Sequence, residues 1–318
     1  MMRPTPVPWF AALTVIAFGC IASDLGLDAP FLCNNGIPEC PSGYSCVDGV
    51  CLTSGAGAES ESESEDGRES ESESEGGGAS CGKPTPLTAA GTYMGNTIAG
   101  FDSVTAEGCG GDGAPEAYFR LELAAETIVY LDTIDTKWNT VLSLRSGTCD
   151  GTMLACNGDG CGTVQSQLIA TAPAGRWFVV VDGAMAGDKG PFTLRYEAAA
   201  CPGSTLLLPG QNLTGTMPPG PGTSSASCGG GTQAELFFHV ASCGNSGPSL
   251  ATCAATSFDS LLHVHQGSCA GPEVSCTDAN ACSGNDEMVT LALPRGLHFV
   301  VLDSDDLGGG TYSLAVFP

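Results

Sequence analysis

The chain has 318 residues with a net charge of −25, and it contains 45 glycines, 20 prolines and 17 cysteines. A hydrophobic content of 42% excludes a wholly disordered chain, while the many glycines and prolines, with only 14% charged residues, favour a turn-rich β protein. So acidic a chain repels phosphate backbones, which excludes nucleic acid as a partner.

The N-terminal residues 1–19 have the pattern of a secretory signal peptide. Arg3 precedes an uncharged stretch that is too short for a comfortable membrane span. The stretch ends in "AFGC", which resembles a bacterial lipobox and predicts lipid attachment at Cys20. Plain cleavage near Ala22 and an uncleaved anchor are the alternatives. Residues 20–32 would then form a tether at the outer membrane or cell surface, with a periplasmic or secreted location as the alternative.

A cysteine-rich segment follows at residues 33–51, with Cys33, Cys40, Cys46 and Cys51 in 19 residues. So short a segment cannot bury a core, and we expect two disulfides to hold it. The string C-P-x-G-x-x-C-x-x-G-x-C resembles EGF-like or disintegrin-like fragments of extracellular proteins. A zinc site is the alternative, although the CxxC pairs usual in zinc modules are missing.

Residues 52–80 contain a run of glutamate and serine between glycine-rich flanks. Nine acidic residues and one arginine occupy positions 59–75. Like-charge repulsion and the lack of apolar side chains predict an unfolded, solvated linker.

The remaining residues hold an internal duplication with an offset close to 120. "WNTVLSLRSGTC" (138–149) matches "FDSLLHVHQGSC" (258–269), and "RWFVVVDG" (176–183) matches "LHFVVLDS" (297–304). Five cysteine positions recur in the same way: Cys81 as Cys201, Cys109 as Cys228, Cys149 as Cys269, Cys156 as Cys276, and Cys161 as Cys282. The pattern predicts two copies of one domain, at 81–198 and 199–318.

Each copy has the periodicity of β-strands. "AYFRLEL" (117–123) and "TVLSLR" (140–145) alternate along the chain, whereas "WFVVVD" (177–182) and "FVVLD" (299–303) are continuous β-branched runs typical of buried strands. About six strands per copy, separated by Gly, Pro and Asn, predict an all-β fold of two tandem antiparallel β-sandwich or jelly-roll-like domains.

The order of motifs resembles a known family. A "CGG" or "CGGG" turn precedes an aromatic strand, then come "WNTVL" or "FDSLL", a cysteine hairpin, G-x-(W/H)-F-V-V and a closing G-x-(Y/F)-x-L. This order is similar to the bacterial pre-peptidase C-terminal (PPC) type of β-sandwich, found on secreted and surface proteins. The resemblance covers both copies, about 238 of 318 residues.

The histidines are the first candidates for catalysis. No G-x-S-x-G or H-E-x-x-H motif occurs. All four histidines lie in the second copy: His239, His263, His265 and His298. Their first-copy counterparts are Arg120, Ser143, Arg145, and either Arg176 or Trp177. This exchange predicts surface strand residues. Because His263 and His265 share a strand face, a zinc or copper site with His239 is the alternative.

Calcium is the favoured cation among the alternatives, because hard cations bind carboxylates on glycine-rich loops. Candidate ligands near strand ends are Asp259, Asp278, Asp286, Asp303 and Asp305, with Glu287 and Asp306 nearby. Their first-copy equivalents are Asn139, Asp159 and Asp182. Turn capping by these side chains without a metal is the more ordinary interpretation.

Cysteine spacing suggests a set of disulfides without settling it. Pairs Cys149–Cys156 and Cys269–Cys276 would close hairpins, Cys81–Cys109 and Cys201–Cys228 would fasten each N-terminal segment, and Cys243–Cys253 would be local. Cys161 and Cys282 would then pair with each other. Alternatively, the pairs are Cys156–Cys161 and Cys276–Cys282.

Together these features predict a non-catalytic envelope or surface lipoprotein. Its membrane contact would be the N-terminal lipid, its cofactor none or calcium, and its partner an extracellular protein or polysaccharide. The large aromatic candidates for sugar contact are better explained as core residues: Tyr118, Trp138, Trp177 and Phe258. The alternatives are a metal-dependent hydrolase or accessory module of a secreted enzyme, and a structural spacer.

Overall fold

The structure, a computed structural model, describes residues 44–47, 50–53, 78–229, 234–244, 247–253, 255–278, 287–304 and 309–317. Several predictions therefore fall outside the described residues, namely the signal peptide, most of the linker, and those for Cys20, Cys33, Cys40, Cys282, Asp286 and Asp305. The chain divides into two compact units, Met1–Ser70 and Glu71–Pro318.

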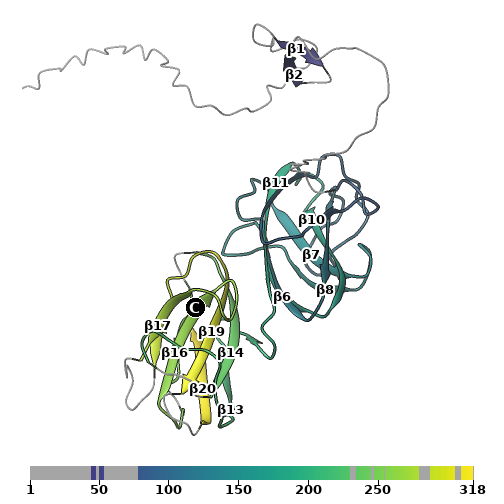
Figure 1. Ribbon diagram of the computed structural model, residues 1–318. Helices are drawn as coiled ribbons and strands as arrows, with labels where there is room; N and C mark the ends of the chain where they lie inside the picture. The colour runs from purple at the N-terminus through teal and green to yellow at the C-terminus, as the bar shows by residue number, and fades with distance from the viewer. Residues whose placement is uncertain are drawn as a thin grey trace, which may run out of the picture. The chain divides into compact units, whose positions relative to one another are not determined.

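In the first unit, the cysteine-rich segment contributes one hairpin. Strands β1 (Tyr44–Val47) and β2 (Val50–Thr53) pair antiparallel, with Cys46 opposite Cys51 (Figure 1).

In the second unit, strands β3 to β11 form two sheets, which we call the first repeat. The five-stranded sheet has the order β3-β5-β10-β7-β8, and the four-stranded sheet has the order β4-β11-β6-β9. All neighbours are antiparallel except β3 and β5. The strands are β3 (Thr85–Pro86), β4 (Gly91–Asn96), β5 (Ala117–Leu123), β6 (Thr127–Asp132), β7 (Thr140–Ser146), β8 (Met153–Asn157), β9 (Gln167–Ala172), β10 (Gly175–Gly183) and β11 (Pro191–Ala199).

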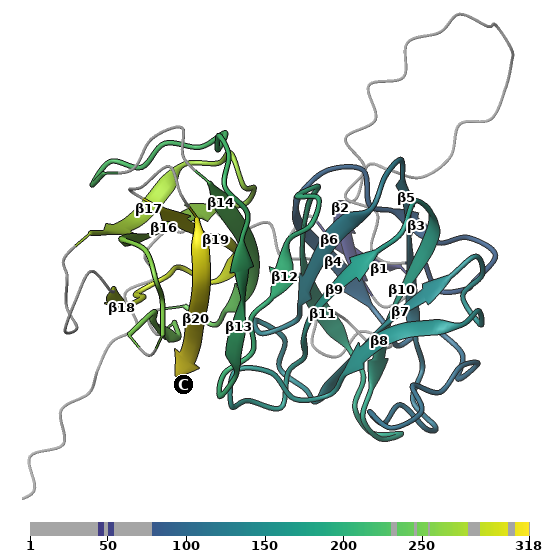
Figure 2. The same cartoon turned by 90° about the horizontal axis from the view of Figure 1, so that it is seen from below.

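Strands β12 to β20 form the second repeat and follow the same plan (Figures 1 and 2). The sheets have the orders β12-β14-β19-β16-β17 and β13-β20-β15-β18. The strands are β12 (Thr205–Leu206), β13 (Asn212–Met217), β14 (Glu235–Ser242), β15 (Ser249–Ala251), β16 (Ser260–Gln266), β17 (Glu273–Thr277), β18 (Met288–Thr290), β19 (Gly296–Ser304) and β20 (Gly310–Phe317). The all-β, antiparallel prediction is confirmed, and each repeat has nine strands in the described residues instead of about six.

In each repeat one core lies between the two sheets. In the first repeat, Phe119 and Val179 of one sheet meet Leu131 and Leu194 of the other in a single buried cluster. The equivalent cluster of the second repeat joins β14 and β19 to β15 and β20. Face-to-face packing through a shared apolar layer makes each repeat a β-sandwich.

The continuous apolar run of β10 has a direct cause in this architecture. β10 is the central strand of its sheet, between β5 and β7. Its residue Val179 points into the sandwich core, whereas Phe178 and Val180 belong to a second cluster on the outer face with Tyr118 and Cys149. Because both faces are covered, no position along the strand favours a polar side chain.

The disulfides repeat between the sandwiches with a pairing that differs from the expected one. The structure joins Cys81 to Cys149, Cys109 to Cys156, Cys201 to Cys269, Cys228 to Cys276, and Cys161 to Cys243. The predicted pairs Cys149–Cys156, Cys269–Cys276, Cys81–Cys109, Cys201–Cys228 and Cys243–Cys253 are therefore wrong. So are the alternatives that pair Cys161 with Cys156 or Cys282 and Cys276 with Cys282. Cys253 also takes part in a disulfide.

Sheet register explains why the hairpin pairs fail. In the β7–β8 hairpin, Cys156 lies opposite Ser143, whereas Cys149 lies in the turn beyond the end of β7. The two cysteines are thus several residues apart along the ladder, and a disulfide needs Cα atoms within about 7 Å of each other. Cys276, opposite His263, repeats the arrangement in the second sandwich.

Candidate functional site

The four histidines are buried, which corrects their prediction as surface residues. None of the four is more than 7% exposed. The ring of His239 bonds Ser204, with 2.8 Å between its Nδ1 and Oγ. The loop at Thr223–Ser225 and His265 line a common cavity of about 270 Å³ beside the sheet. Contacts with chain segments outside the sheet contribute to the burial of the histidines, and periodicity along one strand does not reveal them.

His263 and His265 bond each other and a turn. The Nδ1 of His263 and the Nε2 of His265 are 2.8 Å apart, and the Nδ1 of His265 donates to the carbonyl of Gly271 at 2.7 Å. In the first repeat, Arg145 makes the equivalent contacts. Its Nε donates to Ser143 Oγ at 3.2 Å, and its Nη1 donates to the Gly151 carbonyl at 3.4 Å. This side chain holds the turn after the strand in both repeats.

The structure does not bring His239 to this pair. His239 on β14 and His265 on β16 are both register partners of Phe299 on the intervening strand β19. Two strand spacings, about 9.6 Å, therefore separate their backbones. Within the described ranges, no group of three or more His, Cys, Asp or Glu side chains is placed to hold a metal ion.

The counterpart of His298 in the first repeat is Trp177 and not Arg176. Trp177 is paired with Leu121 and His298 with Val240, at the same position in each sheet. Each ring donates to the carbonyl of a proline four residues earlier, Trp177 at 2.9 Å and His298 at 2.8 Å. The histidine therefore replaces the indole in a structural role.

Burial sets the protonation of the histidines. It lowers the pKa of His239 to about 4, and burial together with the charge of His265 lowers the pKa of His263 to about 4. Burial also lowers the pKa of His298. These rings are neutral at physiological pH, in keeping with roles as hydrogen-bonding core residues.

The described carboxylates of the calcium prediction lie at strand ends. Asp303 Oδ1 accepts a bond of 2.7 Å from the N–H of Ser304, and Asp182 Oδ1 accepts the same bond from Gly183. Asp278 lies against the backbone of Gly229, where an added Cβ would be 2.9 Å from Asp278 Oδ2. The observed contacts of Asp182 and Asp303 are those of turn-capping side chains.

Sequence reasoning missed a pair of equivalent glutamates, Glu116 and Glu235. Glu116 accepts bonds from the N–H groups of Ser103 and Val104, at 2.7–3.0 Å. Glu235 accepts from the N–H and hydroxyl groups of Thr223 and Ser224. Each glutamate fastens the long loop before its strand, and the shared string E-x-(Y/F)-F was the available signal.

Glu116 also perturbs the neighbouring strand end. Burial, followed by the nearby charge of Glu116, raises the pKa of Asp182 to about 8. Burial raises the pKa of Glu116 as well, against the bonds from Val104 and Ser103. At neutral pH, Asp182 is therefore largely protonated.

The four aromatics considered for sugar contact belong to the cores. Tyr118, Trp177 and Phe258 are at most 6% exposed. Trp138 packs edge-to-face on Phe192, and its Nε1 donates to the Pro191 carbonyl at 3.0 Å. Their positions favour packing over ligand contact.

The two repeats meet through an apolar cluster of their own. Ile128 and Tyr130 on β6 and Ala199 on β11 pack with Leu297 and Phe299 on β19. The disulfide Cys161–Cys243 crosses from the first repeat to the second. Such a junction buries apolar surface and adds a covalent link, so the repeats are joined as one body.

Polar contacts surround this cluster. Arg295 bonds Asp135, with Nη2···Oδ2 at 2.5 Å, and its Nε is 3.5 Å from Asp132 Oδ2. Gln167 Nε2 donates to the hydroxyl of Tyr130 and to the carbonyl of Ser242, both at 3.1 Å. The bond with Arg295 lowers the pKa of Asp135. Each contact crosses or abuts the junction.

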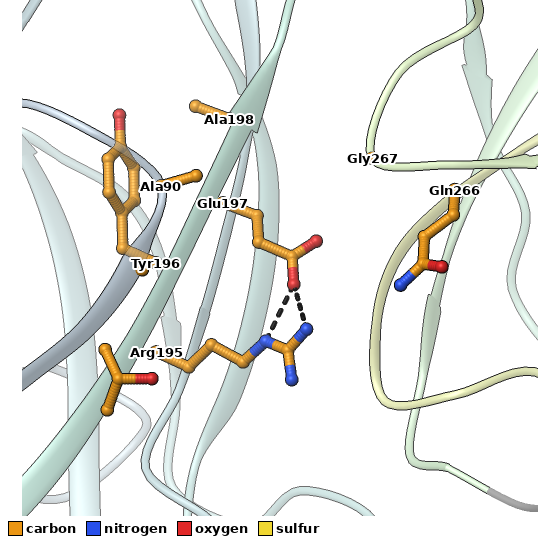
Figure 3. A pocket seen from close by; sticks show the side chains of 9 residues that line it. Ala90, Arg195, Tyr196, Glu197, Ala198, Gln266 and Gly267 are labelled. Carbon is orange, nitrogen blue, oxygen red and sulfur yellow. Dashed lines mark hydrogen bonds and ion pairs between the residues drawn. The ribbon is translucent and has the colours of Figure 1, made fainter. Parts of the chain in front are cut away.

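Beside the junction lies a groove of about 490 Å³ that both repeats line, and we take it as the candidate functional site (Figure 3). Its lining residues are Ala90, Gly91, Thr92, Arg195, Tyr196, Glu197, Ala198, Gln266 and Gly267. Arg195 and Glu197 form an ion pair at 2.5 Å, and Glu197 Oε2 also accepts a 3.0 Å bond from the N–H of Leu297. The groove is thus lined by an ion pair and by polar side chains from both repeats.

Comparisons with known proteins give structural similarities only. No family model and no curated protein matches the sequence. One similar solved structure is the pre-peptidase C-terminal domain of a collagenase from Bacillus anthracis, with 13% identity and a TM-score of 0.24, covering 36% of this chain and 93% of that one. The CUB1-EGF-CUB2 domains of rat MASP-1 are 9% identical with a TM-score of 0.19, covering 73% and 99%.

Tripeptidyl peptidase 2 is 12% identical with a TM-score of 0.21, and the similarity covers 74% of this chain but only 24% of that protein. The collagenase domain is of the pre-peptidase C-terminal type, which the sequence motifs also resemble. The fold of each repeat is defined by its own two sheets. Across the part of the chain that the structure describes, no helix has the length and hydrophobicity to span a membrane.

Proposed function

We propose that the chain is an exported, non-catalytic envelope lipoprotein whose two repeats act together as one binding module for an extracellular protein or polysaccharide. The observation that carries this proposal is the groove lined by both repeats beside a junction with its own disulfide. A groove made by two sandwiches needs their relative position to be fixed, and the disulfide and the ion pairs of Arg295 supply that restraint.

The histidines support a binding role over a hydrolytic one. His265 and His298 repeat hydrogen bonds that Arg145 and Trp177 make in the first repeat. These structural hydrogen bonds explain the presence of His265 and His298 without a catalytic role. The ring nitrogens of His265 are both engaged, which leaves neither for a metal or a substrate.

Export is supported by the disulfides, since several disulfides persist only in oxidising compartments of ordinary cells. Anchoring through Cys20 at the outer membrane or cell surface is part of the proposal, with release into the periplasm or medium as its alternative. Calcium binding near Asp259, Asp278 and Asp303 also stays a prediction, which calorimetric titration with calcium chloride would test on the full chain.

Binding measurements test whether the groove is the ligand-binding site. The full chain would be applied to arrays of purified envelope polysaccharides and to immobilised extracellular proteins, together with Arg195→Ala and Gln266→Ala. Arg176→Ala is the matched control, because Arg176 is an exposed arginine paired with Glu122 at 2.7 Å outside the groove. We expect the groove variants to lose binding and the control to keep it. Equal binding by all variants would contradict the proposal.

Anchoring and chemistry need separate tests. Peptide mapping without reduction reports an acyl group on Cys20, and Cys20→Ser should release the chain from membranes.

The enzyme alternative predicts stoichiometric zinc that is lost in His263→Ala, together with hydrolysis of a bound polymer. Finding both would replace the binding proposal.

A further inference from the structure

A second cavity lies on the second repeat, on the sheet face that is turned away from the sandwich core. It measures about 270 Å³ and is lined by residues 223–225 of the loop before β14, Phe237 on β14, His265 on β16, and the turn residues Cys269 and Ala270. Phe237 packs on the apolar cluster at the junction, whereas the next residue, Phe238, lies in the core. The cavity shares no lining residue with the groove between the repeats, so it is a separate candidate site.

The first repeat shows this space filled. The hydrogen bonds of the two equivalent glutamates align the loops, so that Val104 of the first repeat is the equivalent of Ser224. Val104 packs against a cluster that contains Tyr118 and Cys149. Tyr118 is only 1% exposed, whereas its equivalent, Phe237, is partly exposed. A valine side chain therefore covers, in the first repeat, the aromatic ring that stays partly uncovered beside Ser224 in the second.

The arginine of the first repeat also reaches across this space. Arg145 Nη2 donates to the carbonyl of Thr105 at 2.6 Å, which ties β7 to the loop. Its equivalent, His265, has one ring nitrogen bonded to His263 and the other to a turn carbonyl. The histidine therefore has no nitrogen left for the carbonyl of Ser225, the equivalent of Thr105, and the space between strand and loop stays open.

The lining lacks acidic and strongly basic side chains. No carboxylate, ammonium or guanidinium group occurs among the residues that line this cavity, all of which the structure describes. Ala270 stands where the first repeat has Asp150, so a carboxylate is missing from this place in the second repeat. The volume lies just below the roughly 300–1,000 Å³ of sites for drug-sized molecules. The cavity therefore suits one small, uncharged group.

The lining combines an apolar ring with hydroxyl groups. Phe237 supplies the ring, and Ser225 is exposed and can both donate and accept hydrogen bonds. Thr223 and Ser224 donate their hydroxyl protons to Glu235, so these two oxygens can accept a bond from a ligand. A matching ligand has one apolar face and several hydroxyl groups at its edge.

We propose that this cavity binds one sugar ring of a neutral glycan. The C–H face of a pyranose ring is apolar and would pack on Phe237, while its hydroxyl groups would bond Ser225 and the oxygens of the two residues before it. An apolar peptide side chain would use the ring and none of these hydroxyl groups. The net charge of −25 disfavours an acidic sugar. The inference goes beyond the proposed function, because it assigns a second site that does not depend on the groove.

A neighbouring cavity extends the site and favours a chain of sugars. It measures about 280 Å³ and shares Thr223 and Phe237 with the first cavity. The rest of its lining consists of the proline-rich residues 218–221, Ala234 and Glu235. Two cavities that share a ring suit consecutive residues of a glycan, so we expect a disaccharide to bind more tightly than a monosaccharide.

Amide chemical shifts of the full mature chain, measured by NMR, test this inference with four probes: methyl β-glucoside, methyl β-galactoside, cellobiose and lactose. We expect saturable shifts at Ser225 and Phe237, with a dissociation constant on the order of 1 mM for a disaccharide. Binding this weak is lost when an array is washed, so it does not obscure the test of the groove. The absence of a saturable shift at these residues with all four sugars would overturn the inference.

Variants separate the cavity from its surroundings. Ser224→Val places the side chain of the first repeat in the cavity and should weaken sugar binding by about tenfold or more. Val104→Ser, the reverse change in the first repeat, is the matched control and should leave sugar binding unaltered. Phe237→Leu removes the ring but keeps an apolar side chain, and it should also weaken binding. Unaltered binding by Ser224→Val and Phe237→Leu would contradict the inference.

Two further outcomes would assign the sites differently. Shifts at Phe237 with N-acetyl-leucine methylamide, and none with the sugars, would replace the glycan with a peptide side chain and sink the inference. Sugar-dependent shifts confined to Arg195 and Gln266 would also overturn it, but would leave the proposed function standing.

Discussion

Trp177 and His298 occupy the same position in the two repeats, and each donates a ring N–H to the carbonyl of a proline four residues earlier. The proline carbonyl closes the turn that leads into β10 or β19. The duplicated sandwich thus kept a hydrogen bond while the residue that makes it changed.

Replacing His298 with Phe should destabilise the second repeat. The change removes the donor to Pro294 while retaining a ring of similar size, so we expect a loss of about 1 kcal/mol in the free energy of unfolding. Denaturant titration measures it. His298→Gln, which keeps an N–H donor, is the control and should lose less. Equal losses in both variants would mean that packing alone holds this position.

Removing the disulfide between the repeats should separate their unfolding. The bond Cys161–Cys243 spans 82 residues, so the double serine variant should lose about 2–4 kcal/mol. Calorimetry should then resolve two transitions in place of one. Cys109→Ser with Cys156→Ser, which opens a disulfide inside the first repeat, should lower stability without separating the repeats. A single unchanged transition in the junction variant would contradict the expectation.

Acid should weaken the second repeat through its histidines. The pKa values of His239 and His263 are about 4 in the folded protein, below the ordinary value of 6.5. Between pH 4 and pH 6.5 the unfolded chain binds more protons than the folded chain, so the free energy of unfolding falls as the pH drops from 6.5 towards 4. Each histidine contributes up to about 3 kcal/mol to that fall. His239→Asn should reduce the slope of stability against pH in this window, and the same slope in the variant would argue against a buried neutral ring.

Alkali should weaken the first repeat through Asp182. Its pKa of about 8 exceeds the ordinary 3.8, so the folded state binds the extra proton and stability falls as the pH rises through this interval. Asp182→Asn keeps an oxygen for the N–H of Gly183 and removes the ionisation. The variant should gain melting temperature at pH 8–9 relative to the parent, and less at pH 5. A gain that does not depend on pH would contradict the assignment.

The sequence predicts the fold well because its signals are local and repeated. Alternation in "AYFRLEL" and the apolar run "WFVVVD" each report burial along one strand, and the duplication doubles every signal. Burial of His263 and the partner of Cys149 depend instead on segments that are distant in sequence. The groove was not predicted at all, because its lining residues, such as Arg195 of the first repeat and Gln266 of the second, come together only when the two repeats pack.

The interlaced disulfides constrain how the chain matures. Cys109 lies between Cys81 and Cys149 in the sequence, and Cys149 lies between Cys109 and Cys156, so the two bonds cross. A chain that enters an oxidising compartment N-terminus first presents Cys109 to Cys81 before Cys149 arrives. Oxidation in order of arrival would therefore join neighbouring cysteines, as it would again at Cys201 and Cys228. Reaching the native bonds then requires thiol–disulfide exchange, which makes maturation dependent on an isomerase or on oxidation that waits for the whole sandwich.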